Sequence, residues 1–459
     1  RCRERLGIRV VPGTPNGGSR LAGRGGQVAP VARGGPLSTF TADASAALAG
    51  PGWLRARRAQ AFERFAAADL PTEAEEVWRY SRIGDLDLDA YAPLGGAAAV
   101  TTAVPAEVAA VVDAAGRRSG LVAVRNGRIA SVELDPELAA RGVELGPLSA
   151  AADGADLLGS VGSPVDAFVD LATAFLDDAV LLRVPPGVAV PDPVVVLHWI
   201  DAPGAAVFPR LVVHAGGSSR VRVVDHVSSP DGVATFVAPV AELDVADDAD
   251  LGYLSVQELG RDAWQVAYQA SRVGREGLLT SSVVALGGAY ARVRTDSSLV
   301  GQGGATRLLA AYFGDGHQEH DFRTMQDHAA PKTVSDLLFK GVVEDEAHAV
   351  YSGLIRVRKG AAGTNAIQTN RNLVLTDGAR ADSVPNLEIE ENDVRCAHAS
   401  AVGPVDEDQL YYLEARGVPP DVAERLIVLG FFDDVIAGVP VESLRPRLRQ
   451  AVEAKVARR

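Results

Sequence analysis

The sequence predicts a mainly β protein whose two ends are helical. Between about residues 185 and 400, apolar runs of four to six residues alternate with breaks rich in Gly, Asp, Asn and Ser, a pattern typical of many short strands joined by turns. The composition agrees, because the 459 residues include 47 Gly and 26 Pro but only 5% aromatic residues. Periodicity alone leaves a sandwich, a barrel and a β-helix open, and no repeat of fixed length favours the last of these.

Individual runs in this middle region support strands rather than helices. Apolar residues alternate with polar ones over residues 219–223 and again over residues 387–390. This two-residue period is typical of a strand with one buried face.

The region before the strands is predicted to be mixed and mostly helical. Leu54, Ala61 and Phe65 recur at helical spacing, and further helices are expected over residues 106–115 and 164–177. Thr72 is followed three residues later by Glu75, which predicts a capping box at the start of another helix.

The region after the strands is predicted to contain three helices. Asp406 is expected to cap the first, over Leu410 and Leu413, and Gly417 to end it. The second helix is expected to open at Pro419–Pro420, and the third to carry Leu448 and to end in basic residues. The apolar face expected for the second helix consists of Val422, Leu426 and Leu429.

These patterns divide the chain into four regions. We expect a disordered Arg- and Gly-rich tail over residues 1–50, a mixed helical region over 51–184, a strand core over 185–400 and a helical domain over 401–459. The tail is polar and rich in Gly, so it buries too little apolar surface to fold. A transit peptide and sequence upstream of the true start are alternative interpretations of this tail.

Charge and cysteine content exclude several classes of protein. The formal charge of −14 argues against a nucleic-acid binder, and no apolar run approaches the 18 residues of a membrane-spanning helix. The two cysteines, Cys2 and Cys396, form no disulfide framework or paired zinc motif, so a cytoplasmic location is expected.

Sequence motifs for nucleotide binding are missing, but three histidines stand close together. The chain has no Gly-x-x-x-x-Gly-Lys-Ser/Thr phosphate loop. His317, His320 and His328 lie within twelve residues, among several carboxylates. They would bind a metal only if they shared a face, and strand positions three apart point to opposite faces. A polar turn with ordinary buried histidines is the alternative.

Cys396 and His398 form the sharper pair. On a strand they project to the same side, roughly 7 Å apart. A thiol beside an imidazole is a soft pair of metal ligands. Because Val394 shares this face, Cys396 is alternatively a core residue.

Several short motifs recur in a distinctive order between residues 320 and 432. They are His320-Asp321, His328, Ser335-Asp336, Lys340-Gly341-Val342, Ser352-Gly353, Ala366-Ile367-Gln368-Thr369-Asn370-Arg371-Asn372-Leu373, Pro385-Asn386-Leu387-Glu388-Ile389, Asp393-Val394-Arg395-Cys396-Ala397-His398 and Gln409-Leu410-Tyr411-Tyr412-Leu413-Glu414-Ala415-Arg416-Gly417. With these motifs the stretch resembles the SufB/SufD family of iron–sulfur cluster assembly proteins. The early Leu70-Pro71-Thr72 and Glu76-Val77-Trp78-Arg79-Tyr80 are similar to the N-terminal signature of this family.

Within this family the chain is most similar to the SufD branch. SufB accepts sulfur on a cysteine in the middle of its β-helix, whereas this chain has no cysteine between Cys2 and Cys396. SufB also tends to carry a Glu at the position of Ala399. The SufD pattern Cys-x-His-Gly-Ala-Thr-x-Gly is only partly matched, since Ala399, Ser400 and Ala401 replace Gly, Ala and Thr.

The resemblance implies a fold and a set of partners. It implies a right-handed parallel β-helix core flanked by N-terminal and C-terminal helical regions. It also implies a non-catalytic scaffold that pairs with a SufB-like paralogue, binds a SufC-like ATPase and belongs to a complex associated with reduced flavin, for which no residue is assigned here.

The resemblance also implies where the partners and the iron–sulfur cluster meet this chain. His398, with Cys396, is expected at the SufB interface, where a transient, shared cluster forms. The ATPase is expected on the helices around residues 406–437. The residues assigned to that contact are Leu410, Tyr411, Tyr412, Arg416, Gly417, Leu426 and Phe431.

Two other functions remain as alternatives. One is a β-helix hydrolase or lyase acting on acidic polysaccharide, which would need paired carboxylates or a basic cleft on the solenoid. The other is a metalloenzyme that uses His317, His320 and His328.

Overall fold

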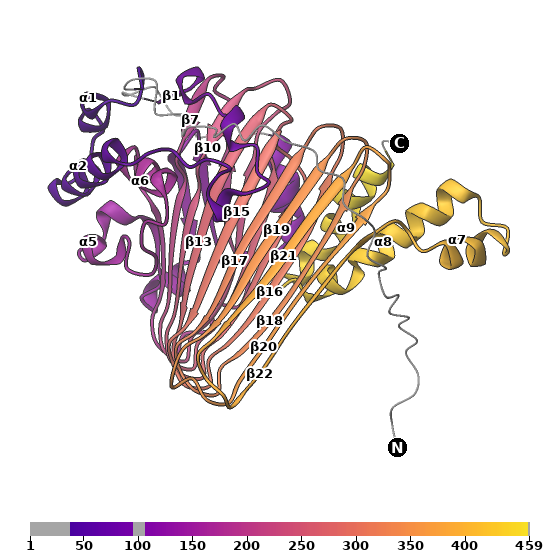
Figure 1. Cartoon of the computed structure of the whole chain (residues 1–459). Coiled ribbons are helices and arrows are strands. Elements are labelled where there is room, and N and C mark those ends of the chain that lie inside the picture. The colour runs from indigo at the N-terminus through magenta and orange to yellow at the C-terminus, as the bar shows by residue number, and fades with distance from the viewer. Residues whose placement is uncertain (1–36, 95–105, 458–459) are drawn as a thin grey trace, which may run out of the picture.

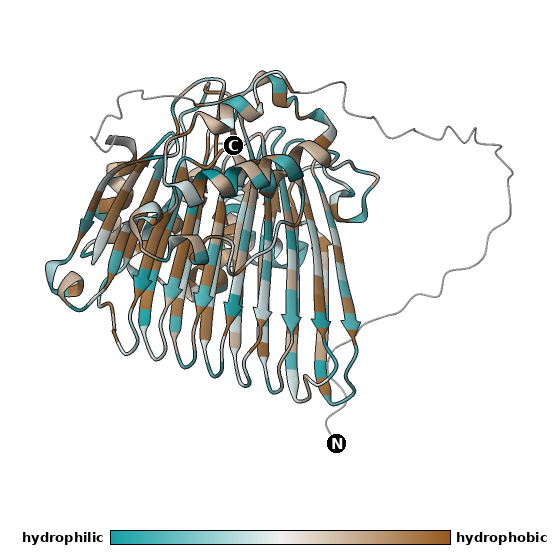
Figure 2. Cartoon of the chain, turned by 90° about the vertical axis from the view of Figure 1, so that its left-hand side faces the viewer, coloured by the Kyte–Doolittle hydropathy of each residue, from teal (hydrophilic) through white to brown (hydrophobic). Residues whose placement is uncertain are grey.

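A computed structural model describes residues 37–94 and 106–457 and shows a parallel β-solenoid with helices at both ends of the chain (Figure 1). Each coil of the solenoid contributes one long strand to each of two sheets, called here sheet A and sheet B. Figure 2 shows neighbouring strands running in the same direction. The predicted mainly β class is confirmed, and of the three architectures left open by periodicity the chain adopts the solenoid.

Sheet A runs from β4 to β21, its edge strand in the last coil of the solenoid. Its long path pairs in parallel except for the first pair, β4 with β5, which is antiparallel. Its strands are β4 (Glu144–Pro147), β5 (Val180–Val184), β8 (Arg210–Ala215), β11 (Val240–Val245), β13 (Ala263–Val273), β15 (Tyr290–Leu299), β17 (Glu319–His328), β19 (His348–Val357) and β21 (Arg380–Ile389), with the short β1 (Ala92–Pro93), β7 (Ala205–Val207) and β10 (Thr235–Val237) beside them.

Sheet B faces sheet A across the solenoid interior and ends in the edge strand β22. Its first pair, β2 with β3, is antiparallel, and the rest are parallel. Its strands are β2 (Gly120–Arg125), β3 (Arg128–Leu134), β6 (Val194–Trp199), β9 (Arg220–Ser228), β12 (Asp250–Glu258), β14 (Leu278–Ala285), β16 (Ala305–Gly314), β18 (Val334–Val343), β20 (Thr364–Val374) and β22 (Val394–Gly403).

The length of one coil varies along the solenoid, which is why no fixed repeat is visible in the sequence. Residues in register on successive strands of sheet A are Trp264, Tyr290, Glu319, His348 and Arg380. Their numbers show coils of 26 to 32 residues. Within each strand, side chains still alternate between the two faces. The difference in coil length lies in the turns.

One corner of the solenoid repeats in backbone conformation but not in sequence. Where the chain passes from sheet A to sheet B, residues with positive φ recur: Ser218, Asp248, Glu276, Gly303 and Lys332. The N–H of each donates to a carbonyl of the next coil, as in Asp248 N to Arg275 O at 2.8 Å. Left-handed backbone favours Gly but is accessible to other residues, so this ladder carries no fixed sequence signal.

The helices cover the outer faces of the two sheets. Early in the chain lie α1 (Ala42–Ala46), α2 (Gly52–Ala67), α3 (Ala106–Ala115), α4 (Pro136–Ala140), α5 (Gly154–Leu157) and α6 (Ala167–Ala174), and late in the chain lie α7 (Glu407–Glu414), α8 (Pro420–Gly438) and α9 (Arg445–Val456). The 3₁₀ helices are η1 (Glu76–Trp78), η2 (Ile83–Asp85), η3 (Leu88–Ala90), η4 (Leu148–Ala150) and η5 (Glu442–Leu444). In the described part of the chain, none of these helices is long and apolar enough to span a membrane.

The N-terminal elements pack on the early strands of sheet A. Phe65 of α2 and Phe168 of α6 share one buried cluster with Phe236, Val266 and Tyr268 on the outer side of that sheet. The C-terminal elements pack on sheet B instead, where Phe432, Val435 and Leu448 share a cluster with its outward-facing residues. Both outer faces are therefore covered over much of their length.

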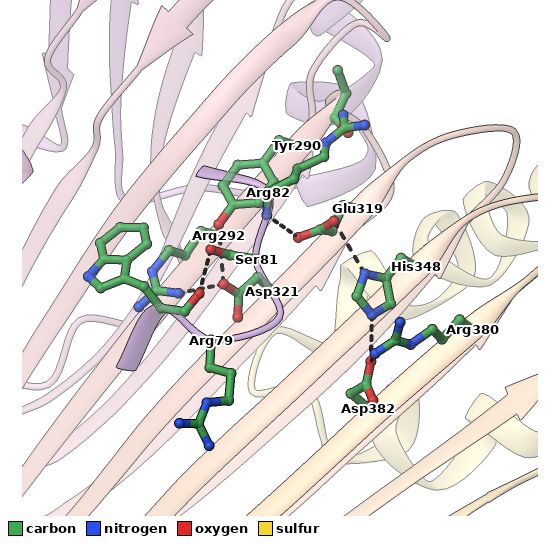
Figure 3. Close-up of polar contacts among 12 residues, drawn as sticks. Arg79, Ser81, Arg82, Tyr290, Arg292, Glu319, Asp321, His348, Arg380 and Asp382 are labelled. Atoms are coloured by element: carbon green, nitrogen blue, oxygen red, sulfur yellow. Dashed lines mark hydrogen bonds and ion pairs between the residues drawn. The ribbon is translucent and has the colours of Figure 1, made fainter. Parts of the chain in front are cut away.

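A short N-terminal segment, residues 76–82, crosses the later coils of sheet A and is called here the strap. Its carbonyls at Val77 and Arg79 accept hydrogen bonds from Arg292 and Arg323, both at 2.7 Å. The backbone N–H of Arg82 donates to Glu319, which also contacts His348, and His348 bonds in turn to Asp382 on β21 (Figure 3). A chain of polar contacts thus joins the strap to the edge strand.

Two predictions about the N-terminal part are wrong. Residues 37–50, assigned to the disordered tail, contain α1 and bury Phe40 and Leu48, and Phe40 belongs to the cluster on sheet A. Residues 1–36 lie outside the described residues. The helix predicted after Thr72 does not form: the N–H of Thr72 does donate to Glu75, but a turn and η1 follow, since burial of Trp78 holds the chain across the sheet.

Candidate functional site

The strands β21 and β22 form the last coil of the solenoid. Within the described residues each of these strands pairs with a single neighbour, β19 and β20 respectively. Their outer edges therefore present backbone N–H and C=O groups without a strand beside them. Such an edge is a ready surface for pairing with another chain.

Pro385 interrupts the free edge of β21. The N–H of Glu390 donates to Val357 of β19, and the N–H of Arg380 donates to Ala347, directly before β19, so even-numbered residues of β21 face that strand. Pro385 is odd-numbered and so faces away from β19, and its nitrogen, which carries no hydrogen, lies at the free edge. A proline here limits how far a partner strand can extend along β21.

His398 lies on the inward-facing row of the last coil. Cys396, His398 and Ser400 are in register with Ala366, Gln368 and Asn370 of β20, all of which are 0% exposed. Because no coil of this chain follows, the same row is open on β22, and His398 is exposed. Sequence parity predicted the shared side of Cys396 and His398, and the register confirms it.

Cys396 is half-buried and belongs to the edge of the core. It packs, together with Val394, against Ile355, Val357 and Ala366. Burial raises the pKa of its thiol, despite a hydrogen bond from the backbone of Ala366. The thiol therefore stays protonated near neutral pH, which makes Cys396 a weaker ligand than its spacing suggested.

The rest of the open end is a mixed surface. Leu387 (39% exposed), Ile389 (43%) and Val402 (45%) are exposed apolar side chains of the last coil. Ser400 of β22 donates a 2.7 Å hydrogen bond to Ser383 of β21 across the end of the solenoid. The last coil therefore presents both apolar and hydrogen-bonding side chains, as protein interfaces do.

The other histidines do not assemble into a metal site. His320 and His328 are buried, and burial lowers their pKa values to about 3 and about 4, with Lys455 also acting on His320. His328 bonds to Thr333 and Ser335, whereas His317 is exposed beside Glu346. Among the residues that the structure describes, no group of three or more His, Cys, Asp and Glu side chains is placed to hold a metal ion.

Of the two predicted partner-binding helices, α7 projects from the body of the molecule (Figure 1), whereas α8 packs on sheet B. Asp406 caps α7 as predicted, and Gly417 adopts a positive φ of 86° just beyond it. Tyr411 is 73% exposed and Tyr412 57% exposed, and Arg416 lies over the Tyr412 ring at 4.9 Å.

One predicted helix face is wrong, whereas the assignment of the partly buried Leu410 and Phe431 to the partner contact stays a prediction. Leu410 and Phe431 pack against the sheet B cluster, and the Phe431 carbonyl accepts a 2.7 Å hydrogen bond from Lys340. Leu426, expected on the buried face of α8, is 48% exposed. The buried face of α8 instead consists of Ala423, Val428, Phe432, Val435 and Ile436. Because α8 is apolar on several sides, only docking on sheet B decides which side is buried.

Sequence reasoning missed the polar platform beneath the last coil. Gln368 and Asn370 are fully buried, and they bond to the hydroxyls of Tyr351 and Tyr312 at 2.6 and 3.0 Å. The signal was present, because polar residues recur at every second position in Gln368, Asn370 and Asn372. Polar residues at the inward positions of a strand mark a hydrogen-bonded interior.

Comparison with known proteins identifies the family. The family model described as SUF system FeS cluster assembly, SufBD core domain, matches residues 198–431, about half of the chain. This stretch runs from β6 through the last coil and into α8.

The chain belongs to the SufBD family. An iron–sulfur cluster assembly SufBD family protein of Mycobacterium tuberculosis is 37% identical over 305 residues, which cover 64% of this chain and 76% of that protein. SufD of Bacillus subtilis is 29% identical over 420 residues, which cover 88% and 94%, and SufD of Escherichia coli is 28% identical over 242 residues, which cover 52% and 56%. Within the SufBD family the chain is most like SufD. This assignment favours iron–sulfur cluster assembly over the polysaccharide-processing and metalloenzyme alternatives.

Proposed function

We propose that this SufBD family protein is a non-catalytic scaffold that joins a SufB-like paralogue to a SufC-like ATPase and contributes His398 to cluster assembly. One observation carries the proposal: in the described part of the chain no strand pairs beyond β21 and β22, and the exposed His398 stands on the inward row of this last coil. A second solenoid stacked on this end would enclose the row between the two chains.

This chain offers too few ligands to hold an iron–sulfur cluster alone, which supports a cluster held jointly with a partner. Iron–sulfur clusters in proteins take about four protein ligands. At the open end this chain offers His398 and, more weakly, Cys396. The remaining ligands, and the sulfur itself, would then come from the SufB-like chain.

The form of the open end supports a solenoid partner in particular. Two strand edges without a described neighbour, with exposed apolar side chains at Leu387, Ile389 and Val402, suit a partner with strands of its own. Pro385 would restrict pairing along β21 to the parts of the strand on either side of it.

The projecting α7 supports a separate site for the ATPase. Its two exposed tyrosines and Arg416 are residue types enriched at protein interfaces. The chain itself has no phosphate-loop sequence, so ATP hydrolysis would be the work of the partner.

The first experiment is co-purification of the tagged chain with a SufB-like and a SufC-like protein expressed beside it. Both are expected to copurify, and recovery of the chain alone under these conditions would contradict the proposal. Deletion of residues 406–437 is unsuitable as a test of docking, because it removes Phe432 and Val435 from the core.

The second experiment is the His398→Ala variant in the assembled complex. Cluster formation, followed by visible absorbance under anaerobic conditions, is expected to slow about tenfold or more, the usual cost of disturbing a metal site. His317→Ala is the matched control, since His317 is exposed near Glu346 in a turn before β17. Assembly at the wild-type rate in His398→Ala would remove His398 from the mechanism.

A further inference from the structure

Gln368 occupies the position directly beneath His398 in the stack of inward-facing side chains. The two residues are in register on β20 and β22, and Gln368 is 0% exposed. On its other side, in register on β18, lies Leu337, which is apolar and also 0% exposed. Of these two neighbours in the stack, His398 is the polar one.

Within the described residues, the amide nitrogen of Gln368 has a hydrogen-bond partner and its amide oxygen has none. Its Nε2 donates to the hydroxyl of Tyr351 at 2.6 Å, and that hydroxyl lies 3.0 Å from Thr324 Oγ1. Its Oε1 is buried and has no hydrogen-bond partner among the described residues. A buried amide oxygen left without a partner costs about 1–3 kcal/mol, so a nearby donor is expected to fill the position.

We propose that Gln368 is a positioning residue for His398: its Oε1 accepts a hydrogen bond from one ring N–H of His398 and so fixes the tautomer and the direction of the imidazole. Neighbouring strands lie about 4.8 Å apart, within reach of these two side chains. The second ring nitrogen is then left as a lone-pair donor turned toward the open end. This inference rests on the proposed function only for its consequence in cluster assembly.

The proposed hydrogen bond from His398 to Gln368 would orient a metal-binding histidine from behind, without contact with the metal itself. A histidine that binds metal generally donates its other N–H to a carbonyl or carboxylate, which orients the ring and sets the tautomer. Thr324, Tyr351 and Gln368 supply a buried, hydrogen-bonded support for that contact.

The direct test is the tautomer of His398 in the full chain, read from imidazole ¹⁵N chemical shifts after labelling of histidine alone. The His398 signal is assigned as the one that is lost in His398→Gln. In the wild-type chain a single tautomer is expected. In Gln368→Leu the ring is expected to return to the mixture of tautomers typical of an exposed histidine.

Gln326→Leu is the matched control. Gln326 is also buried, also has an unpartnered Oε1, and donates to Ser335 on β18 and, at 3.5 Å, to the carbonyl of Ile367 on β20, but not to β22. This variant is expected to leave the His398 signal unchanged. An unchanged tautomer mixture of His398 in Gln368→Leu would overturn the inference.

Cluster assembly in the complex separates this inference from the proposed function. Gln368→Leu is expected to slow assembly about tenfold, and Gln368→Glu, which keeps an acceptor, to restore most of the rate. If His398→Ala abolishes assembly while Gln368→Leu leaves the tautomer unchanged, the positioning role is wrong and the proposed function stands. If the tautomer responds but His398→Ala assembles cluster normally, the positioning role stands and the proposed function is wrong.

Discussion

The guanidinium of Arg292 lies over the indole ring of Trp78, with its central carbon 3.6 Å from the ring centroid. Arg292 also pairs with the buried Asp321 and donates to the carbonyl of Val77. Strap and solenoid therefore meet at one buried cation, which contacts an aromatic ring, a carboxylate and a backbone oxygen at once.

The Arg292→Met variant is expected to lose about 3–5 kcal/mol of unfolding free energy, because it removes one partner from a buried ion pair. Asp321 keeps Arg323, and the strap loses the bond to Val77. Urea unfolding followed by circular dichroism measures the change. Arg356→Met is the control, since Arg356 sits on the outer face of β19 in looser pairs with Glu388 and Glu390, and equal midpoints for the two variants would contradict the prediction.

The stabilising effect of His348 is expected to depend on pH. Burial alone lowers its pKa, but the hydrogen bonds and charges of Glu319 and Asp382 outweigh burial, and the pKa is raised. A raised pKa in the folded state means that the charged His348 stabilises fully below its unfolded value of about 6.5, and that this contribution is lost as the pH rises through the folded value.

His348→Gln is therefore expected to cost about 2 kcal/mol at pH 6 and progressively less at pH 8 and above. Thermal or urea unfolding of both proteins across this range measures the gap. His317→Gln serves as the control for changing an exposed histidine. A gap that stays constant or widens with rising pH would show that the ion pairs of His348 are not responsible.

Gly353 is expected to tolerate no side chain. A Cβ at this position would lie 1.9 Å from Gln368 Nε2 and 2.3 Å from the Tyr351 hydroxyl, in the fully buried interior. Gly353→Ala is therefore expected to lose about 1–3 kcal/mol through overpacking. In the control Gly403→Ala the added Cβ meets nothing within 4 Å, so a similar melting temperature for both variants would refute the argument.

Tyr411 and Tyr412 are expected to matter for binding and not for folding. Because both are largely exposed, the double change to Ser should alter the unfolding free energy by less than about 0.5 kcal/mol while reducing recovery of the ATPase partner. Phe432→Ala, in the buried face of α8, should instead cost about 3–5 kcal/mol. Undiminished ATPase recovery with the tyrosine variant would place that partner elsewhere on the chain.

Local sequence patterns predicted those elements whose signals are local. The caps at Asp406 and Gly417 follow from single residues beside an apolar run, and both appear as expected. The prediction of the buried face of α8 was wrong because apolar residues surround this helix. The prediction of a helix after Thr72 was wrong because the burial of Trp78 outweighs a capping pattern.

The sequence could predict which residues of the candidate site share one side of a strand, but not whether that side is exposed to solvent. Parity on a strand places Cys396 and His398 on one side, whatever the rest of the fold. Whether that side is core or surface depends on whether another coil follows. The inward rows of β20 and β22 differ in just this respect, so Gln368 is buried and His398 is exposed.

The sequence by itself determined the strand-rich middle, the helical ends, the family motifs and the shared side of Cys396 and His398, because each depends on residues close together in the chain. Only the tertiary structure decided the stacking of the coils, the strap across sheet A and the open end that carries His398. Coil length varies and the left-handed corners accept several residue types, so these features depend on contacts between residues about thirty positions apart or more, which no local pattern records.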